Sequence, residues 1–345
     1  MKLVDVEQAV GLVLAHDVTE IGRDRKHSLF RRGHLIRAQD VPRFLDLGKR
    51  HLYVADAPPG ALHENDAADR LGEAVAGSGL APSEAREGKV RLEAALDGFV
   101  RVRRDALASF NALREVICVT RRSYHRVRTG EEAAALKVLP LLIDHATVAT
   151  AEALAEDAGG LVEVVPPRRY RVGLVVTGSE VASGRIEDAF GPLLREKLAE
   201  FGSEVAAVAF SGDSPEEIEI GLRDHLARGC DMIIVTGGMS VDPDDRTPAA
   251  IRRVADRVLF QWVPALPGCM NMLAVHTCPE TGQDIPLLGV PACGIHHRRT
   301  VLDLILLRLA AGVLPDRDEV DAFGHGGACL ECEDCRFPNC TFGSV

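Results

Sequence analysis

Residues 169–315 are predicted to form an α/β fold in which helices cover both faces of a mostly parallel sheet. Apolar, β-branched runs such as 171–177 and 232–235 have the composition of buried strands. Segments with helical periodicity lie between such runs, and one of them begins at Ser214 with the residues of a capping box. Strands that alternate with helices form parallel sheets, because each crossover needs a covering helix.

The elements of this segment are expected in a regular order. The expected strands are 171–177, 204–210, 232–235, 258–263 and 285–290, and the expected helices are 186–201, one from Pro215, one from Pro248, and about 295–313. Thr247 is expected to be the N-cap of the helix that begins at Pro248, because threonine is favoured at that position and proline at the next.

The rest of the chain is predicted to form smaller regions. Two N-terminal α+β regions are expected at 1–56 and 57–168, and a Cys-rich tail at 316–345. The strands expected in the first two regions are 51–55, 99–102, 116–120 and 135–143, and the expected helices are 41–47, 62–76, 105–113 and 148–155.

Three loops at the carboxyl ends of the predicted strands are rich in glycine, hydroxyl and carboxylate groups. They are residues 177–180, 212–214 and 236–238. In open α/β sheets, ligands bind outside the carboxyl ends of the strands. The three loops are therefore expected to meet at one crevice.

The third loop is the most informative part of the sequence. Gly237 and Gly238 allow a backbone to approach an anion, and Asp242, Asp244 and Asp245 follow them. Carboxylates repel phosphate unless a divalent cation lies between them, so the loop suggests a phosphorylated ligand held partly through Mg²⁺. The alternative is a glycine-rich turn between a strand and a helix, with solvated acids.

The same motifs carry a resemblance to a known family. TGSEV with GRIED (177–188), Asp213, TGGMSVDPDDRTP (236–248), Pro267-Gly268 and Gly289-Val290-Pro291 resemble the molybdopterin-binding domain shared by molybdopterin adenylyltransferases and molybdopterin molybdenumtransferases. The resemblance covers residues 170–315. The run from Ala9 to Ala15 is also similar to the opening of a molybdenumtransferase.

This resemblance implies a three-layer helix–sheet–helix fold that binds molybdopterin or its adenylylated form. It implies that Asp213 and Asp245 are catalytic acids and that Asp245 holds Mg²⁺. The residues implied to bind the pterin cofactor are Thr177, Gly178, Ser179, Glu180, Thr236, Gly237, Gly238, Ser240, Asp242, Pro267, Gly268, Gly289 and Pro291.

The implied activity is insertion of molybdate, or a related oxyanion, into bound molybdopterin, with relatives that assemble as homo-oligomers. The chain departs from the family pattern at Ser179, at Cys269-Met270 where a Lys-Pro pair is common, and at 289–294. The last two departures favour an alternative function, a non-catalytic molybdopterin-binding chaperone or sensor, whereas the retained Asp213 and Asp245 favour the enzyme. A nucleotide-processing hydrolase on the same fold is a third hypothesis.

Four cysteines lie within twelve residues of the tail. Cys329, Cys332, Cys335 and Cys340 have the spacing C-x₂-C-x₂-C-x₄-C, which is typical of thiolates that surround one metal centre. The spacing predicts either a [4Fe–4S] cluster or Zn²⁺, and redox-active or free thiols are the alternative.

Composition excludes several other classes of protein. A formal net charge of −11 argues against a nucleic-acid-binding protein, and the sequence contains no apolar run of the length that a membrane helix needs. The first eighteen residues contain acids and lack a small-residue cleavage site, so no signal peptide is expected and the protein is predicted to be cytoplasmic.

Overall fold

The computed structural model describes residues 1–21, 26–54, 60–178, 190–240, 242 and 245–343. The chain divides into two compact units. The first unit comprises residues 1–96, 100–122 and 127–164, and the second comprises 97–99, 123–126 and 165–345.

The second unit contains a six-stranded sheet. Its strands are β14 (Arg171–Thr177), β15 (Glu204–Ser211), β16 (Met232–Thr236), β17 (Arg257–Gln261), β18 (Met272–Thr277) and β19 (Asp284–Val290). They lie in the order β15-β14-β16-β19-β18-β17. The first four are parallel to one another, whereas β18 is antiparallel to both β19 and β17. The prediction of a mostly parallel sheet is confirmed.

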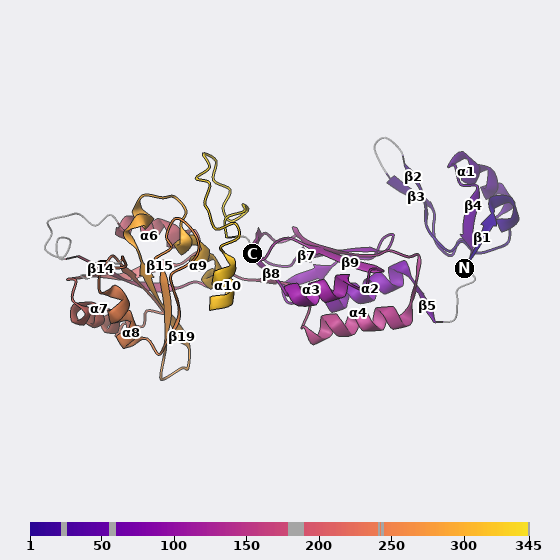
Figure 1. Cartoon of the computed structure of the whole chain (residues 1–345). Coiled ribbons are helices and arrows are strands. Elements are labelled where there is room, and N and C mark those ends of the chain that lie inside the picture. Colours follow the sequence, from indigo (N-terminus) through magenta and orange to yellow (C-terminus); the bar gives the residue numbers. More distant parts are fainter. Residues whose placement is uncertain (22–25, 55–59, 179–189, 241, 243–244, 344–345) are drawn as a thin grey trace. The chain divides into compact units, whose positions relative to one another are not determined.

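Helices cover both faces of this sheet (Figure 1). They are α6 (Phe190–Ala199), α7 (Pro215–Ala227), α8 (Thr247–Val254), α9 (Val301–Ala310) and α10 (Arg317–Ala322), with the 3₁₀ helix η3 (Ala292–Ile295). Leu174 and Val176 of β14 belong to the same core as Leu198 of α6 and Ile305 of α9. Val175, on the opposite face of β14, packs in the core that α7 and α8 cover. The predicted three-layer fold is therefore confirmed.

Three local predictions for this unit are wrong. Strand β18 was not expected. The helix predicted at about 295–313 is confined to Val301–Ala310, because Thr300 and Asp303 form a capping box at its start. Thr247 is the first residue of α8 rather than its N-cap, and no side-chain cap bond is present at Arg246. The Thr247 hydroxyl donates to the Gly237 carbonyl instead, at 2.8 Å.

The first unit is built around a four-stranded antiparallel sheet with the order β6-β7-β11-β9. Helices α2 (Glu64–Val75) and α3 (Arg104–Asn111) pack against this sheet, and α4 (His145–Asp157) packs against both helices. The strands of the first unit as a whole are β1 (Lys2–Asp5), β2 (Val18–Ile21), β3 (Lys26–Phe30), β4 (His51–Val54), β5 (Ala61–His63), β6 (Leu80–Pro82), β7 (Lys89–Ala94), β9 (Val116–Thr120), β11 (Glu132–Val138), β12 (Leu142–Asp144) and most of β13 (Val162–Val165). Strands β8 (Gly98–Val102) and β10 (Arg126–Val127) contain residues of both units.

The helices of the first unit agree in type with the predictions. They are α1 (Val41–Asp46), α2 (Glu64–Val75), α3 (Arg104–Asn111) and α4 (His145–Asp157), with the 3₁₀ helices η1 (Val6–Ala9) and η2 (Ala38–Asp40). The strand predicted at 135–143 is two strands, β11 and β12. Pro140 lies between them, and proline lacks the N–H group that would continue the ladder.

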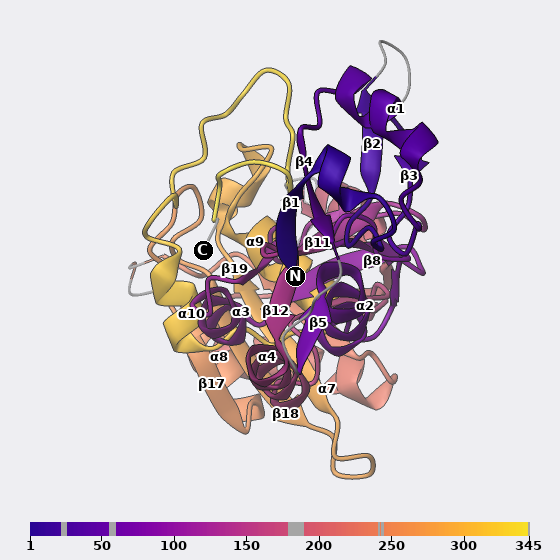
Figure 2. The ribbon, with the colours of Figure 1, turned by 90° about the vertical axis from the view of Figure 1, so that its right-hand side faces the viewer.

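The tail continues beyond α10 without a regular helix or strand (Figures 1 and 2). Phe323 is fully buried and Phe342 is 5% exposed, so both ends of this segment are packed into the core of the second unit. Leu266 donates its amide to Gly327, and Cys329 donates its amide to Leu266. We call residues 326–343 the cysteine lobe.

Candidate functional site

Three parallel strands end at the same edge of the sheet, as the sequence predicts. Thr177 is the last residue of β14, and its hydroxyl donates to the carbonyl of Thr236, the last residue of β16, at 2.8 Å. Gly178 donates its amide to Ser211 at the end of β15, at 3.1 Å. The three predicted loops therefore begin side by side, with the loop after β14 between the other two.

The helices that follow two of these strands leave toward opposite faces of the sheet. Helix α6 follows β14 and packs in one core, whereas α8 follows the neighbouring strand β16 and packs in the other. A crevice is expected where neighbouring strands connect to opposite faces, and ligands of open α/β sheets bind at such points.

Two glycines fix the shape of the loop after β16. Gly237 and Gly238 have φ values of +87° and +60°, in the left-handed region that favours glycine. A Cβ at Gly237 would lie 2.7 Å from the Thr177 hydroxyl oxygen, and one at Gly238 would lie 2.6 Å from that of Thr247. The loop can therefore stay this close to β14 and α8 only with glycine at both positions.

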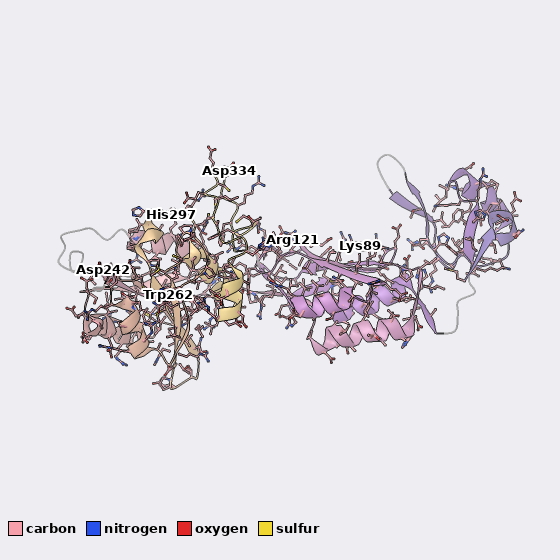
Figure 3. The ribbon with its side chains drawn as sticks, viewed as in Figure 1. Lys89, Arg121, Asp242, Trp262, His297 and Asp334 are labelled. Atoms are coloured by element: carbon pink, nitrogen blue, oxygen red, sulfur yellow. The ribbon has the colours of Figure 1, made fainter. Side chains whose placement is uncertain are left out.

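The carboxylate of Asp245 helps to fold the same loop. Its Oδ2 accepts a hydrogen bond from the Ser240 amide at 2.7 Å, and its own amide donates to the Asp242 carbonyl at 2.9 Å. Asp242 is exposed at this end of the second unit (Figure 3). The loop thus presents two acids close to the glycines, in the arrangement that the sequence predicts.

Asp213 lies in the turn after β15 and is exposed. The next residue, Ser214, is the N-cap of α7 and accepts a hydrogen bond from the Glu217 amide. Strands β15 and β16 lie on either side of β14, so Asp213 and Asp245 are brought to the same edge from opposite sides of that strand. Ser179 and Glu180, which the sequence also predicts in this site, lie outside the described residues.

The loop of Pro267 and Gly268 is tied to the start of α9. The Pro267 carbonyl accepts the Val301 amide at 2.9 Å, and Gly268 has a φ of +105°. A Cβ at Gly268 would lie 3.1 Å from the Val301 nitrogen, so a larger residue would crowd the helix N-terminus. Because β17 runs parallel to β19, this loop lies at the same edge of the sheet as the other predicted loops.

Gly289 and Pro291 are buried at the end of β19. Gly289 pairs with Val235 of β16, and a Cβ there would lie 2.5 Å from the sulfur of Met239. Gly289 therefore makes room for Met239 beneath the glycine loop. The Gly237 amide donates to the Val290 carbonyl at 3.1 Å, which joins this loop to the end of β19.

Two buried polar atoms at this edge have no hydrogen-bond partner among the residues that the structure describes. The hydroxyl oxygen of Thr236 and the Oδ1 of Asn271 are both unpaired, and each residue is 1% exposed. Asn271 was not predicted, since an asparagine in a turn has no sequence signal that separates a ligand contact from a turn residue. Its Nδ2 donates to the Gly268 carbonyl at 2.7 Å. Buried unpaired polar atoms are rare and call for an explanation.

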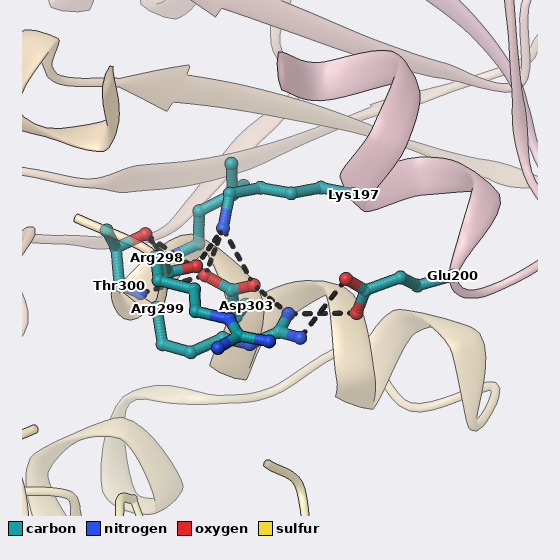
Figure 4. Close-up of polar contacts among 7 residues, drawn as sticks. Lys197, Glu200, Arg298, Arg299, Thr300 and Asp303 are labelled. Carbon is teal, nitrogen blue, oxygen red and sulfur yellow. Dashed lines mark hydrogen bonds and ion pairs between the residues drawn. The ribbon is translucent and has the colours of Figure 1, made fainter. Parts of the chain in front are cut away.

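A buried network of charges lies beside the start of α9 (Figure 4). Lys197 of α6 donates to Asp303 at 2.8 Å, and their side chains are 4% and 0% exposed. Arg299 pairs with the same carboxylate at 2.8 Å and with Glu200 at 2.8 Å. Asp303 also accepts the Thr300 amide at 2.8 Å. The network fastens α6 to the segment that leads from β19 into α9.

The cysteine lobe lies against that same segment. His297 and Glu331 form an ion pair when the histidine is protonated, and the Arg299 guanidinium lies 4.9 Å from the Phe337 ring centre. Burial disfavours the Cys335 thiolate, but the Phe337 amide and Arg299 outweigh burial and lower the pKa of this thiol.

All four predicted cysteine ligands line one cavity, together with Arg299. Within the described part of the chain, no three His, Cys, Asp or Glu side chains are grouped as a site for a metal ion. No described helix has the length and apolar character that crossing a membrane requires.

Comparisons with known proteins agree with the sequence resemblance. Residues 173–310 match the family described as "Probable molybdopterin binding domain". Residues 3–56 match "Domain of unknown function (DUF8806)".

Among curated proteins, the CinA-like protein of Mycobacterium sp. (strain MCS) is 43% identical over 90 residues, which are 26% of this chain and 21% of that protein. The CinA-like protein of Mycobacterium avium (strain 104) is 41% identical over 93 residues, or 27% of this chain and 21% of that protein. The matches thus span 21% of the length of these relatives.

Solved structures are similar over part of the chain. The tungsten cofactor synthesizing protein MoaB from Pyrococcus furiosus is 18% identical, with a TM-score of 0.33 over 42% of this chain and 99% of that chain. The molybdopterin biosynthesis enzyme MoaB from Thermus thermophilus is 27% identical, with a TM-score of 0.34 over 42% of this chain and 98% of that chain.

Proposed function

We propose that this chain, a member of the molybdopterin-binding domain family through residues 173–310, binds molybdopterin or its adenylylated form at the ends of β14, β15 and β16. The domain is related to molybdopterin biosynthesis, and the finer proposal is that it inserts molybdate or a related oxyanion into the bound pterin. Bound molybdopterin would supply the sulfur atoms that take the metal. The observation that carries the proposal is the buried, unpaired Thr236 hydroxyl in the glycine loop.

The residues at this edge fit a phosphorylated ligand. Gly237 and Gly238 keep side chains away from the loop, so a phosphate can approach the backbone. The Thr236 hydroxyl can donate to a ligand oxygen, which would satisfy an atom that otherwise bears the cost of burial without a partner. In this proposal Thr177 and Gly178 contact the ligand from the end of β14, the strand beside β16.

In this proposal Mg²⁺ is held next to the phosphate by Asp245, with Asp242 and Asp213 on the same edge. The Ser240 amide holds one oxygen of Asp245 at 2.7 Å, which orients the carboxylate. In proteins, Mg²⁺ is usually bound by one or two carboxylates together with phosphate oxygens of the ligand. Asp213 and Asp245 would then serve the metal-dependent step, and Ser240, Pro267, Gly268, Gly289 and Pro291 would shape the site.

A change at Thr236 tests the site most directly. Thr236→Val keeps the shape of the side chain and removes the hydroxyl. It should weaken molybdopterin binding by about 2- to 10-fold, the value of one neutral hydrogen bond. The variant should unfold at the same or a higher urea concentration, because an unpaired buried polar atom has been removed. Calorimetric binding equal to that of the unchanged protein would exclude this hydroxyl from the site.

A change at Asp245 tests the metal-dependent step. Asp245→Asn should lose Mg²⁺-dependent molybdate insertion while its free energy of unfolding falls by less than about 1 kcal/mol, because asparagine keeps an oxygen that can accept the Ser240 amide. The matched control is Asp224→Asn on α7, an exposed acid that pairs with Arg228. Equal turnover by Asp245→Asn and the control would contradict the catalytic role.

The second candidate function is a non-catalytic molybdopterin-binding chaperone or sensor. Cys269 and Met270 favour it, since they replace residues that would bring a cation to the Pro267-Gly268 loop. The two candidates differ in one outcome: the binding module retains molybdopterin without releasing metallated product in the presence of molybdate and Mg²⁺. Both candidates include a homo-oligomer, which light scattering would detect, and a metal centre, either [4Fe–4S] or Zn²⁺, at the C-terminal cysteines.

A further inference from the structure

The four cysteines of the lobe surround a space that is larger than a site for one ion. Cys329, Cys332, Cys335 and Cys340 line a cavity of about 50 Å³. At about 10–15 Å³ for each water position, this cavity has room for roughly three to five waters. Four thiolates on one Zn²⁺ would lie about 2.3 Å from the ion and would enclose no such space.

A four-iron cluster agrees better with this arrangement. Each cysteine of a [4Fe–4S] cluster binds a different iron, so the four sulfurs stand farther apart than around one ion. All four cysteines share the cavity, and the other residues that line it supply no further carboxylate or imidazole. We propose that this cavity binds a [4Fe–4S] cluster through Cys329, Cys332, Cys335 and Cys340.

The rest of the lining suits such a cluster. Leu330, Phe337 and Phe342 contribute apolar groups to the cavity, and Phe342 is 5% exposed. An apolar shell limits solvent access, which is one of the factors that set the potential of a metal site. This assignment rests on the metal centre of the proposed function and chooses between its two alternatives, and its test does not depend on molybdopterin binding.

Backbone hydrogen bonds anchor both ends of the cysteine lobe. The amide of Leu266 donates to Gly327 at 2.8 Å and that of Cys329 donates back to Leu266 at 2.9 Å, which anchors the start of the lobe. The Gly343 amide donates to the Gly326 carbonyl at 3.0 Å and closes the lobe at its other end. The four cysteines therefore lie in a loop whose two ends are held together.

Arg299 is the positioning residue of this site. Arg299 lines the cavity together with the four cysteines, its guanidinium lies over the Phe337 ring, and its ion-pair partners are Glu200 and Asp303. A cluster with four thiolates carries a net negative charge, and hydrogen bonds to the sulfurs and nearby charge set its reduction potential. The geometry assigns Arg299 the role of stabilising the reduced cluster.

Metal analysis of the full chain tests the cluster. Protein purified anaerobically, or reconstituted with ferrous iron and sulfide, should contain about four iron and four sulfide per chain and give an EPR signal after reduction by dithionite. Cys332→Ser should lose most of this iron without disturbing the packing, because Cys332 is exposed. The matched control is Cys278→Ser, outside the lobe, which should keep it. One zinc without sulfide, no metal, or equal iron in both variants would overturn the proposal.

The reduction potential tests Arg299. Arg299→Gln removes a positive charge next to the cluster and should lower its midpoint potential. Glu200→Gln breaks the ion pair between Arg299 and Glu200 but keeps the guanidinium, so it should not lower the potential. A residue with only a structural role would change the unfolding of the lobe and leave the potential where it was. That result would overturn the role of Arg299.

Discussion

Replacement of Asp303 by asparagine should destabilise the second unit more than any surface change. Asp303→Asn keeps the volume of the side chain and an oxygen that can accept the Thr300 amide. It removes the negative charge that lies 2.8 Å from both Lys197 and Arg299. Arg299 keeps Glu200 as a partner, but Lys197 is left as a buried ammonium without a counter-ion, because its remaining acceptors, the Arg298 carbonyl and the retained side-chain oxygen at position 303, are neutral.

The expected cost follows from that burial. Removal of one partner from a buried ion pair costs about 3–5 kcal/mol, because the remaining charge has no counter-ion. For a unit of this size the loss corresponds to a fall in Tm of roughly 6–20 °C. The double variant Lys197→Met with Asp303→Asn should recover much of the loss, since no unpaired ammonium remains.

The assay is urea unfolding followed by tryptophan fluorescence. Trp262, labelled in Figure 3, is the single tryptophan of the chain and belongs to the second unit, so the signal reports that unit alone. Asp224→Asn, which breaks an exposed pair on α7, is the control and should cost less than about 1 kcal/mol. A loss for Asp303→Asn as small as that of the control would refute the reasoning, as would a double variant less stable than the single one.

Two further predictions concern backbone strain and pH. Gly238→Ala should lower the free energy of unfolding more than Gly312→Ala does. Both glycines have positive φ, but only a Cβ at Gly238 would lie against Thr247. If the two variants lowered the urea midpoint of the Trp262 fluorescence transition equally, the steric argument would be contradicted. Burial and the charge of Arg32 lower the pKa of His63 below its usual 6.5. The stability contributed by the neutral ring is therefore fully present above pH 6.5 and is lost as the pH falls through the folded-state value. His63 Nδ1 accepts the Asn65 amide at the start of α2, so the protection factor of the Asn65 amide, which removes the intrinsic pH dependence of exchange, should fall as the pH drops through the folded-state value but should not follow that titration in His63→Gln.

Local sequence patterns predicted most elements of the second unit. The apolar run of β14 and the Ser214 start of α7 depend on neighbours within a few residues, and both are where the pattern placed them. Strand β18 was missed because a short apolar run cannot be told from a buried helix segment by periodicity alone. Its pairing with β17 and β19 makes it a strand.

Some features of the candidate site were likewise predictable from local sequence, and others were not. The glycines and hydroxyls at the strand ends were readable from the sequence, because parallel strands bring their carboxyl ends to one edge. The role of Thr247 was not readable, since a hydroxyl at a helix start can cap its own helix or bond elsewhere. Here it reaches the Gly237 carbonyl, ten residues earlier in the chain.

The sequence by itself therefore determined the α/β class of residues 169–315, the loops at the strand ends and the spacing of the four cysteines. Only the tertiary structure decided that Lys197 meets Asp303, 106 residues away, and that Arg299 lines the same cavity as the four cysteines. The physical reason is range: periodicity and capping act over a few residues, whereas a buried charge takes its partner from whichever segment the fold places beside it.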